Sequence, residues 1–239
     1  MNQKNILILG ANGFIGQALQ DKLNNENYIY CLDCTYINEE KESNSKYQVK
    51  LDITKEEDVI KFSQYLEKNN IQIDAIVNLV GINTMSSFYN ITDQDWDRTF
   101  DLNVKSYVFF LKAIYSSLAK QVAIVNVASQ NGIVGHEERI AYGPSKAALI
   151  QLTKNLSIDF LKDRSRDIKI NSVSPSYIQN ESNESYLNSA EGKKLLQKIP
   201  YKKFVSISDV VNVITFLISS ESNAIRGQNI VVDYGYTIV

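Results

Sequence analysis

The feature that most constrains the fold of this 239-residue chain is an alternation of short, continuous apolar runs with longer amphipathic stretches. The apolar runs are rich in Val and Ile, as expected of parallel strands that are buried on both faces. They predict strands at Ile6–Leu9, Tyr28–Leu32, Tyr47–Leu51, Ala75–Leu79, Val122–Val127, Ile168–Val173 and Asn229–Val232. The amphipathic stretches predict helices at Phe14–Asn24, Lys55–Lys68, Asp93–Leu118, Tyr142–Leu161 and Ile207–Ser219. The alternation predicts an α/β fold, a doubly wound parallel sheet of about seven strands with helices on both faces.

Two polar stretches depart from this alternation. Cys34–Lys46 predicts a loop where such an architecture normally has a helix. Ser176–Pro200 follows a strand, so it should rise from the carboxyl edge of the sheet, where ligands bind in such folds. We expect one domain over residues 1–239 with a mobile substrate lid at about 176–200, and an ordinary surface excursion is the alternative.

Composition excludes several classes of protein. Hydrophobic residues make up 44% and charged residues 22% of the chain, and the net charge of −2 lacks the basic excess of a nucleic-acid binder. No apolar run is long enough to span a membrane, and Met1–Lys4 leads into a strand rather than a signal peptide. We therefore expect a cytoplasmic protein with no nucleic-acid or membrane partner.

The cysteine pair Cys31 and Cys34 has C-x-x-C spacing, which raises a redox or metal-binding interpretation. There is no second pair, and His136 is the only histidine, so a zinc ion would lack protein ligands. We expect no metal site, and two small side chains at a strand end are the simpler interpretation.

A glycine-rich turn, Gly10-Ala-Asn-Gly13-Phe-Ile-Gly16, follows the first strand and opens the first helix. Glycine suits a tight turn, the close approach of backbone to a pyrophosphate and close helix–strand packing. The helix N-terminus adds unpaired N–H groups and a favourable dipole for phosphate. The pattern predicts a dinucleotide site of the Rossmann type, and a tight turn with no ligand is the alternative.

Asp33 ends the second strand, 17 residues after Gly16. An acidic residue at this spacing accepts hydrogen bonds from ribose hydroxyls and repels a 2′-phosphate. No Arg or Lys lies in the turn, and none follows Asp33 until Lys41, which favours NAD(H) over NADP(H). Asp52 either contacts adenine or caps the helix near Lys55, and the two roles are compatible. The candidate cofactor contacts are Gly10, Asn12, Gly13, Phe14, Ile15, Gly16, Asp33, Asp52, Ile53, Asn78, Val80, Gly81, Tyr142, Lys146, Pro175 and Ile178.

Tyr142-Gly-Pro-Ser-Lys146 is the most specific motif in the chain. Pro144 suits the first turn of a helix, so the helix should begin near Tyr142 and place Lys146 on the same face. A nearby ammonium favours the phenolate, which allows Tyr142 to give or take a proton at neutral pH. Lys146 would also hold the nicotinamide ribose. A surface Tyr and Lys at helical spacing are the alternative.

Two further polar residues support a catalytic site. Ser129 follows the strand Val122–Val127, so its hydroxyl should meet Tyr142 at the carboxyl edge and polarise the same carbonyl oxygen, or else serve as a turn serine. Asn103 lies within a predicted helix, where Asn is disfavoured. A bridge to Lys146 through water would explain it, and a helix irregularity without function is the alternative.

The chain resembles the short-chain dehydrogenase/reductase family in its compact, single-domain branch. The resemblance covers nearly the whole length and rests on the motifs above, with Ser174-Pro175 and Gly227–Gly235. It implies that Asn103, Ser129, Tyr142 and Lys146 form a catalytic tetrad. It also implies a homo-oligomer, a tetramer or dimer, that packs the helices at Asp93–Leu118 and Tyr142–Leu161.

The chain departs from the family pattern at several positions. Phe14 and Ser176 occupy positions where compact members carry Gly, Tyr234 also replaces a Gly, and Leu79-Val80 replaces Asn-Ala. The Gly10/Gly13/Gly16 spacing resembles the larger, sugar-nucleotide-modifying branch, although the C-terminal region of that branch is absent. These differences predict a reshaped nicotinamide and substrate pocket.

We therefore expect an NAD-dependent oxidoreductase that transfers a hydride between nicotinamide and a carbonyl or secondary alcohol. The polar Ser176–Ser189 stretch favours a small polar substrate such as a sugar, polyol or hydroxy acid. The alternatives are a 3-oxoacyl-thioester reductase, a non-redox epimerase that recycles its cofactor, and a nucleotide sensor without turnover.

Overall fold

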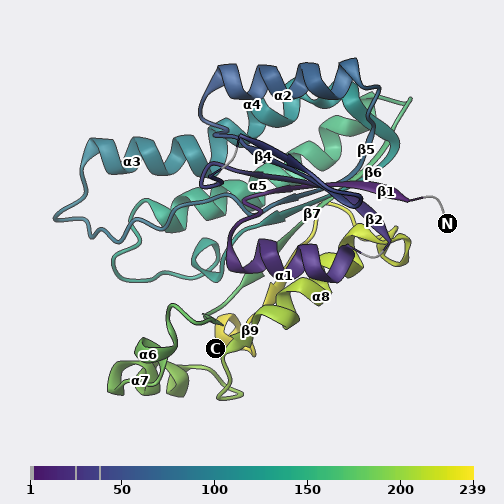
Figure 1. The fold of residues 1–239 in the computed structure, drawn as a ribbon. Helices are drawn as coiled ribbons and strands as arrows, with labels where there is room; N and C mark the ends of the chain where they lie inside the picture. Colours follow the sequence, from purple (N-terminus) through teal and green to yellow (C-terminus); the bar gives the residue numbers. More distant parts are fainter. Residues whose placement is uncertain (1–2, 25, 38) are drawn as a thin grey trace.

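The computed structural model describes residues 3–24, 26–37 and 39–239, which form an eight-stranded sheet covered by helices (Figure 1). The strands run in the order β10-β7-β6-β5-β1-β2-β4-β3, and every neighbouring pair except β3–β4 is parallel. Their bounds are β1 (Lys4–Leu9), β2 (Asn27–Asp33), β3 (Glu40–Glu42), β4 (Lys46–Lys50), β5 (Ile73–Asn78), β6 (Leu118–Val127), β7 (Asp167–Pro175) and β10 (Asn229–Val232). This confirms the predicted doubly wound sheet.

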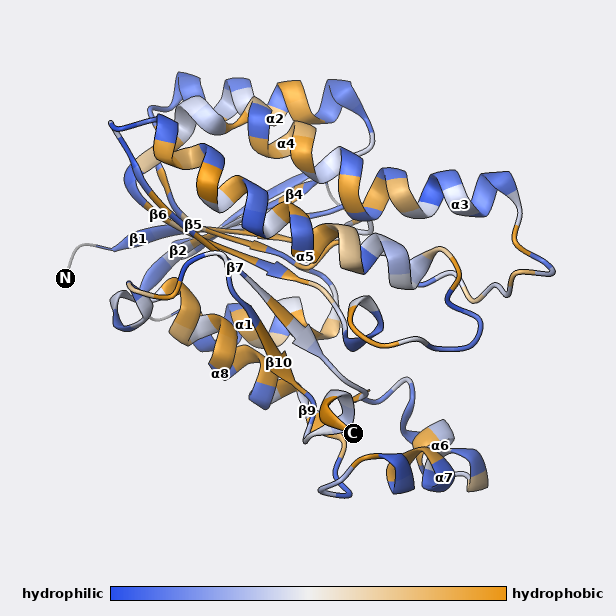
Figure 2. Cartoon of the chain, turned by 180° about the vertical axis from the view of Figure 1, so that it is seen from behind, coloured by the Kyte–Doolittle hydropathy of each residue, from blue (hydrophilic) through white to orange (hydrophobic). Residues whose placement is uncertain are grey.

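The helices form a layer on each face of the sheet (Figure 1). One layer contains α1 (Phe14–Leu23) and α8 (Ile207–Ile218), and the other contains α2 (Glu56–Lys68), α4 (Ser106–Ala113) and α5 (Tyr142–Asp159). Successive side chains of a strand point to opposite faces, so Leu7 joins the core under α2, α4 and α5 while Ile8 joins the core under α1 and α8. Figure 2 shows the resulting apolar strands and the apolar helix faces turned toward them.

The predicted loop at Cys34–Lys46 is wrong in part, because Glu40–Glu42 forms the antiparallel edge strand β3 against β4. All three residues of β3 are exposed. A charged edge strand protects a sheet from pairing with another chain, and its polar sequence looks like a loop.

The predicted helix at Asp93–Leu118 is correct in extent but not in geometry. It contains α3 (Asp93–Phe100), a π-helical turn η1 (Asp101–Lys105), α4 and a 3-10 turn η2 (Tyr115–Ser117), and Leu118 already belongs to β6. Single π turns inside α-helices occur frequently at functional sites. This turn contains Asn103, so the irregularity considered from the sequence is present and lies at that residue.

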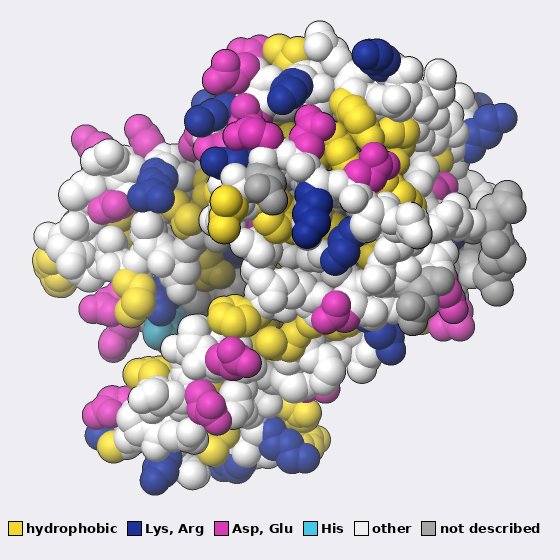
Figure 3. Space-filling model, in the orientation of Figure 1, with side chains coloured by type: hydrophobic (Ala, Val, Ile, Leu, Met, Phe, Trp, Pro, Cys, Tyr) yellow, Lys and Arg dark blue, Asp and Glu magenta, His cyan; other side chains and the backbone are white. Residues whose placement is uncertain are grey.

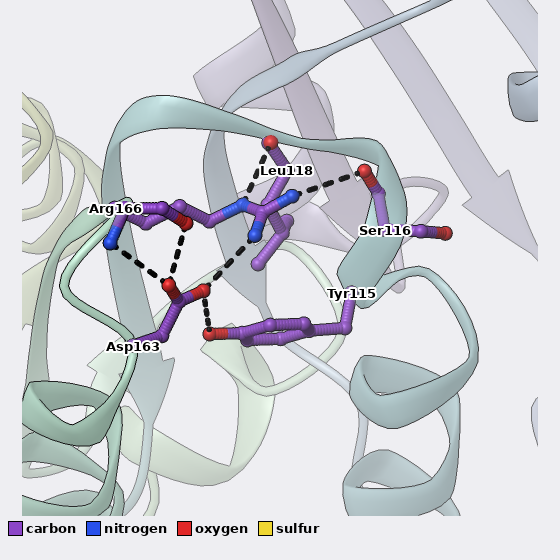
Figure 4. Close-up of polar contacts among 6 residues, drawn as sticks. Tyr115, Ser116, Leu118, Asp163 and Arg166 are labelled. Atoms are coloured by element: carbon purple, nitrogen blue, oxygen red, sulfur yellow. Dashed lines mark hydrogen bonds and ion pairs between the residues drawn. The ribbon is translucent and has the colours of Figure 1, made fainter.

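Four further 3-10 turns are η3 (Gln130–Gly132), η4 (Phe160–Lys162), η5 (Ser220–Ser222) and η6 (Tyr236–Ile238). The turn after α5 is anchored by Asp163, which accepts hydrogen bonds from Tyr115 Oη and Arg166 Nη1, each at 2.9 Å (Figure 4). Arg166 also donates to the carbonyl oxygens of Ser116 and Leu118. This cluster fastens the end of α5 to the start of β6, at the edge of the sheet opposite the candidate site.

Residues 176–200 leave the sheet after β7 and carry two short helices, α6 (Glu184–Leu187) and α7 (Ala190–Lys198), which lie apart from the main body (Figure 1). The segment is tied back by a small parallel pair, β8 (Ile178–Gln179) and β9 (Val205–Ser206). Among the described residues, no helix is both long and apolar enough to cross a membrane.

Candidate active site

The sheet order reverses at β1, which pairs with β2 on one side and β5 on the other. Ligands bind in open α/β sheets at the carboxyl end of such a reversal. A cleft of about 250 Å³ lies there, lined by Leu9, Gly10, Gly13, Leu32, Asp33, Cys34, Leu51, Asp52, Ile53, Leu79, Val80, Gly81, Ile82 and Leu102. Seven of the predicted cofactor contacts therefore share one cleft: Gly10, Gly13, Asp33, Asp52, Ile53, Val80 and Gly81.

The glycine-rich turn has the geometry that the sequence predicts. Gly10 has a φ of +76°, a conformation that other residues rarely adopt, and its N–H donates to Leu32 O at 2.9 Å. A Cβ at Gly16 would lie 2.6 Å from Ala11 O, so only glycine permits this approach of helix to turn. Gly13 caps α1 without a side chain, which leaves the N–H groups of the first helical turn open to a phosphate.

Asp33 fastens this turn to the end of β2. Its Oδ2 accepts from Asn12 N at 2.9 Å, while its Oδ1 accepts from the backbone N–H and the hydroxyl of Thr35. Asn12 Nδ2 donates in turn to Thr35 Oγ1 at 2.8 Å. The carboxylate thus holds the backbone of the turn and also lines the cleft.

The other predicted cofactor residues lie around the same edge. Asp52 forms a local turn by accepting from the backbone and hydroxyl of Thr54, and α2 begins after Lys55 without a side-chain cap, so the capping role considered for Asp52 is wrong. Asn78 Oδ1 accepts from Val80 N at 3.1 Å, and its Nδ2 is buried without a partner. Phe14 is 46% exposed at the first residue of α1, whereas Ile15 packs on the core.

Tyr142 is the first residue of α5, and Pro144 lies in its first turn, as predicted. Lys146 is buried, and its Nζ donates to Val127 O at 3.0 Å. The same Nζ lies 5.9 Å from the centre of the Tyr142 ring. The helical spacing therefore places ammonium and phenol side by side at the carboxyl end of β6.

Ser129 is buried directly after β6 and caps η3, since its Oγ accepts from Asn131 N at 3.2 Å. The turn role considered for this serine is therefore real. Its hydroxyl also acts on the phenol of Tyr142, because a hydrogen bond from Ser129 lowers the pKa of that phenol. Both roles use the same side chain, and they bring Ser129 and Tyr142 together.

Asn103 links the π turn to the strand edge and to α5. Its Oδ1 accepts from Ile82 N at 2.8 Å, and its Nδ2 donates to Ile82 O at 3.0 Å and to Ser145 Oγ at 2.9 Å. A Cβ at Gly81 would lie 2.9 Å from Lys146 Nζ and 3.2 Å from Asn103 Oδ1. Asn103 and Lys146 therefore approach each other with only glycine between them.

Burial controls the electrostatics of the pair. Loss of solvation lowers the pKa of Lys146 from 10.5 to about 8, because the charged form is disfavoured in the interior. Burial also raises the pKa of Tyr142, while Ser129 and the positive charge of Arg139 oppose this rise. Lys146 is thus able to change protonation state closer to neutrality than an exposed amine, whereas burial keeps the phenol of Tyr142 protonated at neutral pH.

Pro175 ends β7, and Ile178 lies in β8 and packs on the core under α1 and α8. Neither lines the dinucleotide cleft described above. Three polar residues beside the site were missed from the sequence: Ser145, whose Oγ donates to Tyr142 O at 2.8 Å, Tyr177 and Arg139. Ser145 lies inside the Tyr142–Lys146 motif and Arg139 lies three residues before it, so proximity in sequence was the available signal.

Cys31 is buried and Cys34 is exposed, and burial raises the pKa of both thiols. Over the described ranges there is no group of three or more His, Cys, Asp and Glu side chains that would hold a metal ion. The candidate site is therefore built from hydroxyl, amide and ammonium groups beside the cleft at the carboxyl edge of the sheet.

Comparison with known proteins places these features in a family. Residues 33–237 match a family model described as enoyl-(acyl carrier protein) reductase. The chain is 26% identical to an NAD-dependent glycerol dehydrogenase of Listeria innocua, over 100% of this chain and 95% of the relative. It is 27% identical to a 3-oxoacyl-(acyl carrier protein) reductase of Buchnera aphidicola, over 98% and 97%.

Solved structures agree. A 4-hydroxyisoleucine dehydrogenase complexed with NADH superposes with a TM-score of 0.88 at 27% identity, over 99% of this chain and 100% of that one. The structure of ElxO with NADP bound gives a TM-score of 0.87 at 27% identity and covers 100% of both chains. Both of these solved structures hold a nicotinamide cofactor, NADH in one and NADP in the other. On the family match over most of its length, this chain belongs to the short-chain dehydrogenase/reductase family.

Proposed function

We propose that this chain is an NAD-preferring oxidoreductase that interconverts a secondary alcohol and a carbonyl on a small polar substrate, with Asn103, Ser129, Tyr142 and Lys146 as its catalytic tetrad. The observation that carries the proposal is the convergence of Ser129, Tyr142 and buried Lys146 beside the dinucleotide cleft. A phenol, a hydroxyl and an ammonium at one strand edge suit proton transfer to a carbonyl oxygen.

Each residue has a distinct role in this proposal. Tyr142 gives its proton to the carbonyl oxygen in reduction and takes it back in oxidation, and the Ser129 hydroxyl hydrogen-bonds to the same oxygen. Lys146 binds ribose hydroxyls, and its ammonium charge stabilises the phenolate that forms when Tyr142 gives up its proton. Asn103 fixes the backbone at Ile82 and, through Ser145, the start of α5. Bound nicotinamide supplies or accepts the hydride.

The residues present fit a dinucleotide. The backbone of Gly10–Gly16 leaves open the space that a Cβ would fill, and the uncapped N-terminus of α1 offers N–H groups to a pyrophosphate. Asp33 and Asp52 line the cleft where adenosine would lie. Two carboxylates and no cation among the cleft residues disfavour a 2′-phosphate, which supports NAD(H) over NADP(H).

We propose that residues 1–239 form one nucleotide-binding domain in which residues 176–200 are a lid over the substrate. The lid follows β7 at the carboxyl edge, and its base is held by β8 and β9. Figure 3 shows a hollow between the main body and the lobe formed by this segment. We propose a small polar substrate. The names of two similar proteins, a glycerol dehydrogenase and a 4-hydroxyisoleucine dehydrogenase, support this class of substrate.

A 3-oxoacyl-thioester reductase is the second candidate. It is favoured by the full-length similarity to the Buchnera reductase and by the family description. Thioester carriers dock on basic surfaces, and Lys193 and Lys194 on α7 and Lys202 and Lys203 after it would be the docking cations. The two candidates differ in substrate and share the tetrad.

The proposal includes a cytoplasmic homo-oligomer, a dimer or tetramer, that packs α4 and α5. Phe109 on α4 and Ile158 on α5 are 57% and 66% exposed, which supports an apolar contact there. Light scattering on the purified protein measures the oligomeric state, and the variant Phe109→Glu with Ile158→Glu should then shift it to monomer. A wild-type monomer would remove this part of the proposal.

The deciding experiment is a titration of the purified protein with NADH and NADPH, followed by nicotinamide fluorescence. Turnover is then measured with NAD on polyols, sugars and hydroxy acids, and with NADH or NADPH on a 3-oxoacyl thioester. Tighter NADH binding and stoichiometric reduction of NAD by a small alcohol support the proposal. Faster thioester reduction favours the second candidate, substrate conversion without net cofactor use favours an epimerase, and binding without turnover favours a sensor.

A further inference from the structure

We propose that Tyr177 is a positioning residue, which ties the loop between Ser129 and Tyr142 to the base of the lid segment, residues 176–200, and so holds the Ser129 hydroxyl in place for catalysis. This inference rests on the proposed function and adds a residue to it. We call residues 129–142 the catalytic loop, because Ser129 begins it and Tyr142 ends it.

The catalytic loop is fastened near both ends. Val134 N donates to Gln130 O at 3.0 Å, which closes a compact turn at the start of the loop. Before α5, an isolated bridge between Arg139 and Ser86 holds the backbone. Residues 135–138, which form the tip of the loop between these two points, are all exposed. The tip therefore depends on contacts with other segments to keep its position.

Tyr177 follows β7 at the base of the lid segment, where its backbone is held on both sides. Its carbonyl oxygen accepts from Val205 N at 3.0 Å, beside the β8–β9 pair, and the N–H of the preceding Ser176 donates to Val232 O at 2.9 Å. Its ring packs edge-on against Tyr236 of the C-terminal turn η6, with ring centres 5.5 Å apart and an interplanar angle of 86°. The side chain therefore projects from a fixed frame formed by the lid base and the C-terminal turn.

The tip of the catalytic loop meets this frame at His136, the only histidine of the chain and the cyan residue beside the hollow in Figure 3. Its Nε2 lies 2.8 Å from Tyr177 Oη, and its Nδ1 lies 2.8 Å from Glu137 O. A carbonyl oxygen only accepts, so Nδ1 carries the ring hydrogen, and in the neutral ring Nε2 then accepts from the phenol. Burial and the neighbouring Tyr236 hydroxyl raise the pKa of Tyr177, so the phenol keeps its proton for this bond at neutral pH.

The same hydroxyl also contacts the start of the catalytic loop. The side chain of Gln130, directly after Ser129, is buried and hydrogen-bonds to the Tyr177 phenol. Within the described residues, both side-chain hydrogen bonds between the catalytic loop and the lid segment end on this one phenol. The hydroxyl of Tyr177 therefore holds the loop at its tip and beside Ser129.

This arrangement predicts an effect on the chemical step rather than on cofactor binding. The Ser129 hydroxyl can assist Tyr142 and a carbonyl oxygen only within a narrow range of distances and angles. A loop that loses its tie to Tyr177 spends less time in that range. The described residues that line the dinucleotide cleft do not include Tyr177, so the affinity for NADH should not depend on its hydroxyl.

The test compares variants of the full chain with NAD and the substrate that gives the highest turnover. Tyr177→Phe removes the hydroxyl and keeps the ring that packs on Tyr236. It should lower kcat about 2- to 12-fold, the usual range for one net hydrogen bond, and change the NADH dissociation constant less than about 2-fold. The melting temperature should change little. Tyr89→Phe, at a tyrosine that is 93% exposed, is the matched control.

His136 provides a second set of variants. His136→Leu should also lower kcat, whereas His136→Gln, whose amide oxygen can still accept from the phenol, should recover part of the loss. The double variant Tyr177→Phe with His136→Leu should lose no more activity than Tyr177→Phe alone, because both changes remove the same bond. Additive losses in the double variant would contradict a shared hydrogen bond.

Nuclear magnetic resonance tests the contact without turnover. His136 is the only histidine, so an isotope-labelled protein with no histidine tag gives one set of imidazole nitrogen signals. We expect the ring hydrogen on Nδ1 in the wild type, and Tyr177→Phe should shift the signal of Nε2. A wild-type ring hydrogen on Nε2, or a signal that Tyr177→Phe leaves unchanged, would overturn the contact.

The outcomes separate this inference from the proposed function. An unchanged kcat in Tyr177→Phe, or parallel losses of kcat, NADH affinity and melting temperature, would overturn the positioning role and leave the proposed function standing. NADH binding by the wild type without turnover of any substrate would instead remove the proposed function and the positioning role with it.

Discussion

Asn103 and Lys146 face each other across Gly81, where a side chain of one carbon would lie 3.2 Å from Asn103 Oδ1 and 2.9 Å from Lys146 Nζ. The three residues come from β5's carboxyl-terminal loop, the π turn and α5, which are remote in sequence. Their arrangement joins the edge of the dinucleotide cleft to the proton-handling pair, because Gly81 also lines that cleft.

Gly81→Ala should therefore displace Lys146 and lower both NADH affinity and kcat. We expect a loss of about 10-fold or more in kcat/KM, because the added Cβ is too close to a fixed ammonium. Gly135→Ala is the matched control, since nothing lies within 4 Å of a Cβ at Gly135. Fluorescence titration and steady-state kinetics measure the two effects. Equal behaviour of the two variants would show that the gap at Gly81 has no role in positioning.

Tyr142→Phe should remove the proton donor and leave the fold intact. General acid–base catalysis contributes about 100- to 10,000-fold, so kcat should fall by that order while NADH binding changes little. The phenol hydroxyl is the only group removed, and α5 begins at this residue through backbone bonds that phenylalanine can make. Near-normal kcat with an unchanged melting temperature would end the proposed mechanism.

Asp33→Asn should weaken the preference for NADH over NADPH by about 10- to 100-fold, a change of roughly 1.4–2.7 kcal/mol. The variant removes the charge that repels a 2′-phosphate and keeps a side chain that can still accept a bond from Asn12 N or Thr35 N. Asp52→Asn removes a charge from the same cleft and is the control. A similar change in both variants would show that the two carboxylates share the discrimination, and no change in Asp33→Asn would place it elsewhere.

Lys146 should give the enzyme a pH dependence near its lowered pKa of about 8. Below this pH the ammonium is charged and Tyr142 is protonated, so carbonyl reduction and NADH binding should be strongest there and fall as pH rises through 8. Lys146→Arg keeps its charge in this range and should bind NADH with a flatter pH profile. A wild-type profile that is flat from pH 6 to 9 would contradict the assignment.

The same pKa has a consequence for stability. Between about pH 8 and 10.5 the unfolded chain binds more protons at Lys146 than the folded chain. The contribution of this group to the free energy of unfolding therefore rises with pH across that window. Comparison of wild type with Lys146→Met by denaturant unfolding at pH 7 and pH 10 measures it, and a greater gain with pH in Lys146→Met than in wild type would contradict it.

Asp163 should make the protein sensitive to acid. Hydrogen bonds from Ser165, Arg166 and Tyr115 hold the pKa of this carboxyl well below its usual range. Its contribution to the free energy of unfolding is therefore fully present above the pKa of an ordinary carboxyl group. The contribution is lost as pH falls through the lower pKa that Asp163 has in the folded protein. Asp163→Asn should lower the melting temperature at pH 7. The difference in melting temperature between this variant and wild type should become smaller in acid, and scanning calorimetry measures it. Asp159→Asn, at an exposed salt bridge, is the control.

The amino-acid sequence by itself determined the features that depend on local geometry. Strand and helix order follows from periodicity, the Gly10–Gly16 turn from backbone conformation, and the Tyr142–Lys146 pair from helical spacing, since each is set by residues a few positions apart. Residue type does not always determine backbone conformation, however. Tyr234 has a left-handed φ of 48° at a position where the family pattern has Gly.

Only the tertiary structure decided what depends on contacts between distant segments. The edge strand β3 exists because β4 lies beside it. Asn103 lies in a π turn, and Ile82 and Ser145 provide the hydrogen-bond partners of its side-chain amide. The lowered pKa of Lys146 and the raised pKa of Tyr142 both follow from burial. Solvation and long-range contacts arise only when the chain is folded, so no local pattern encodes them.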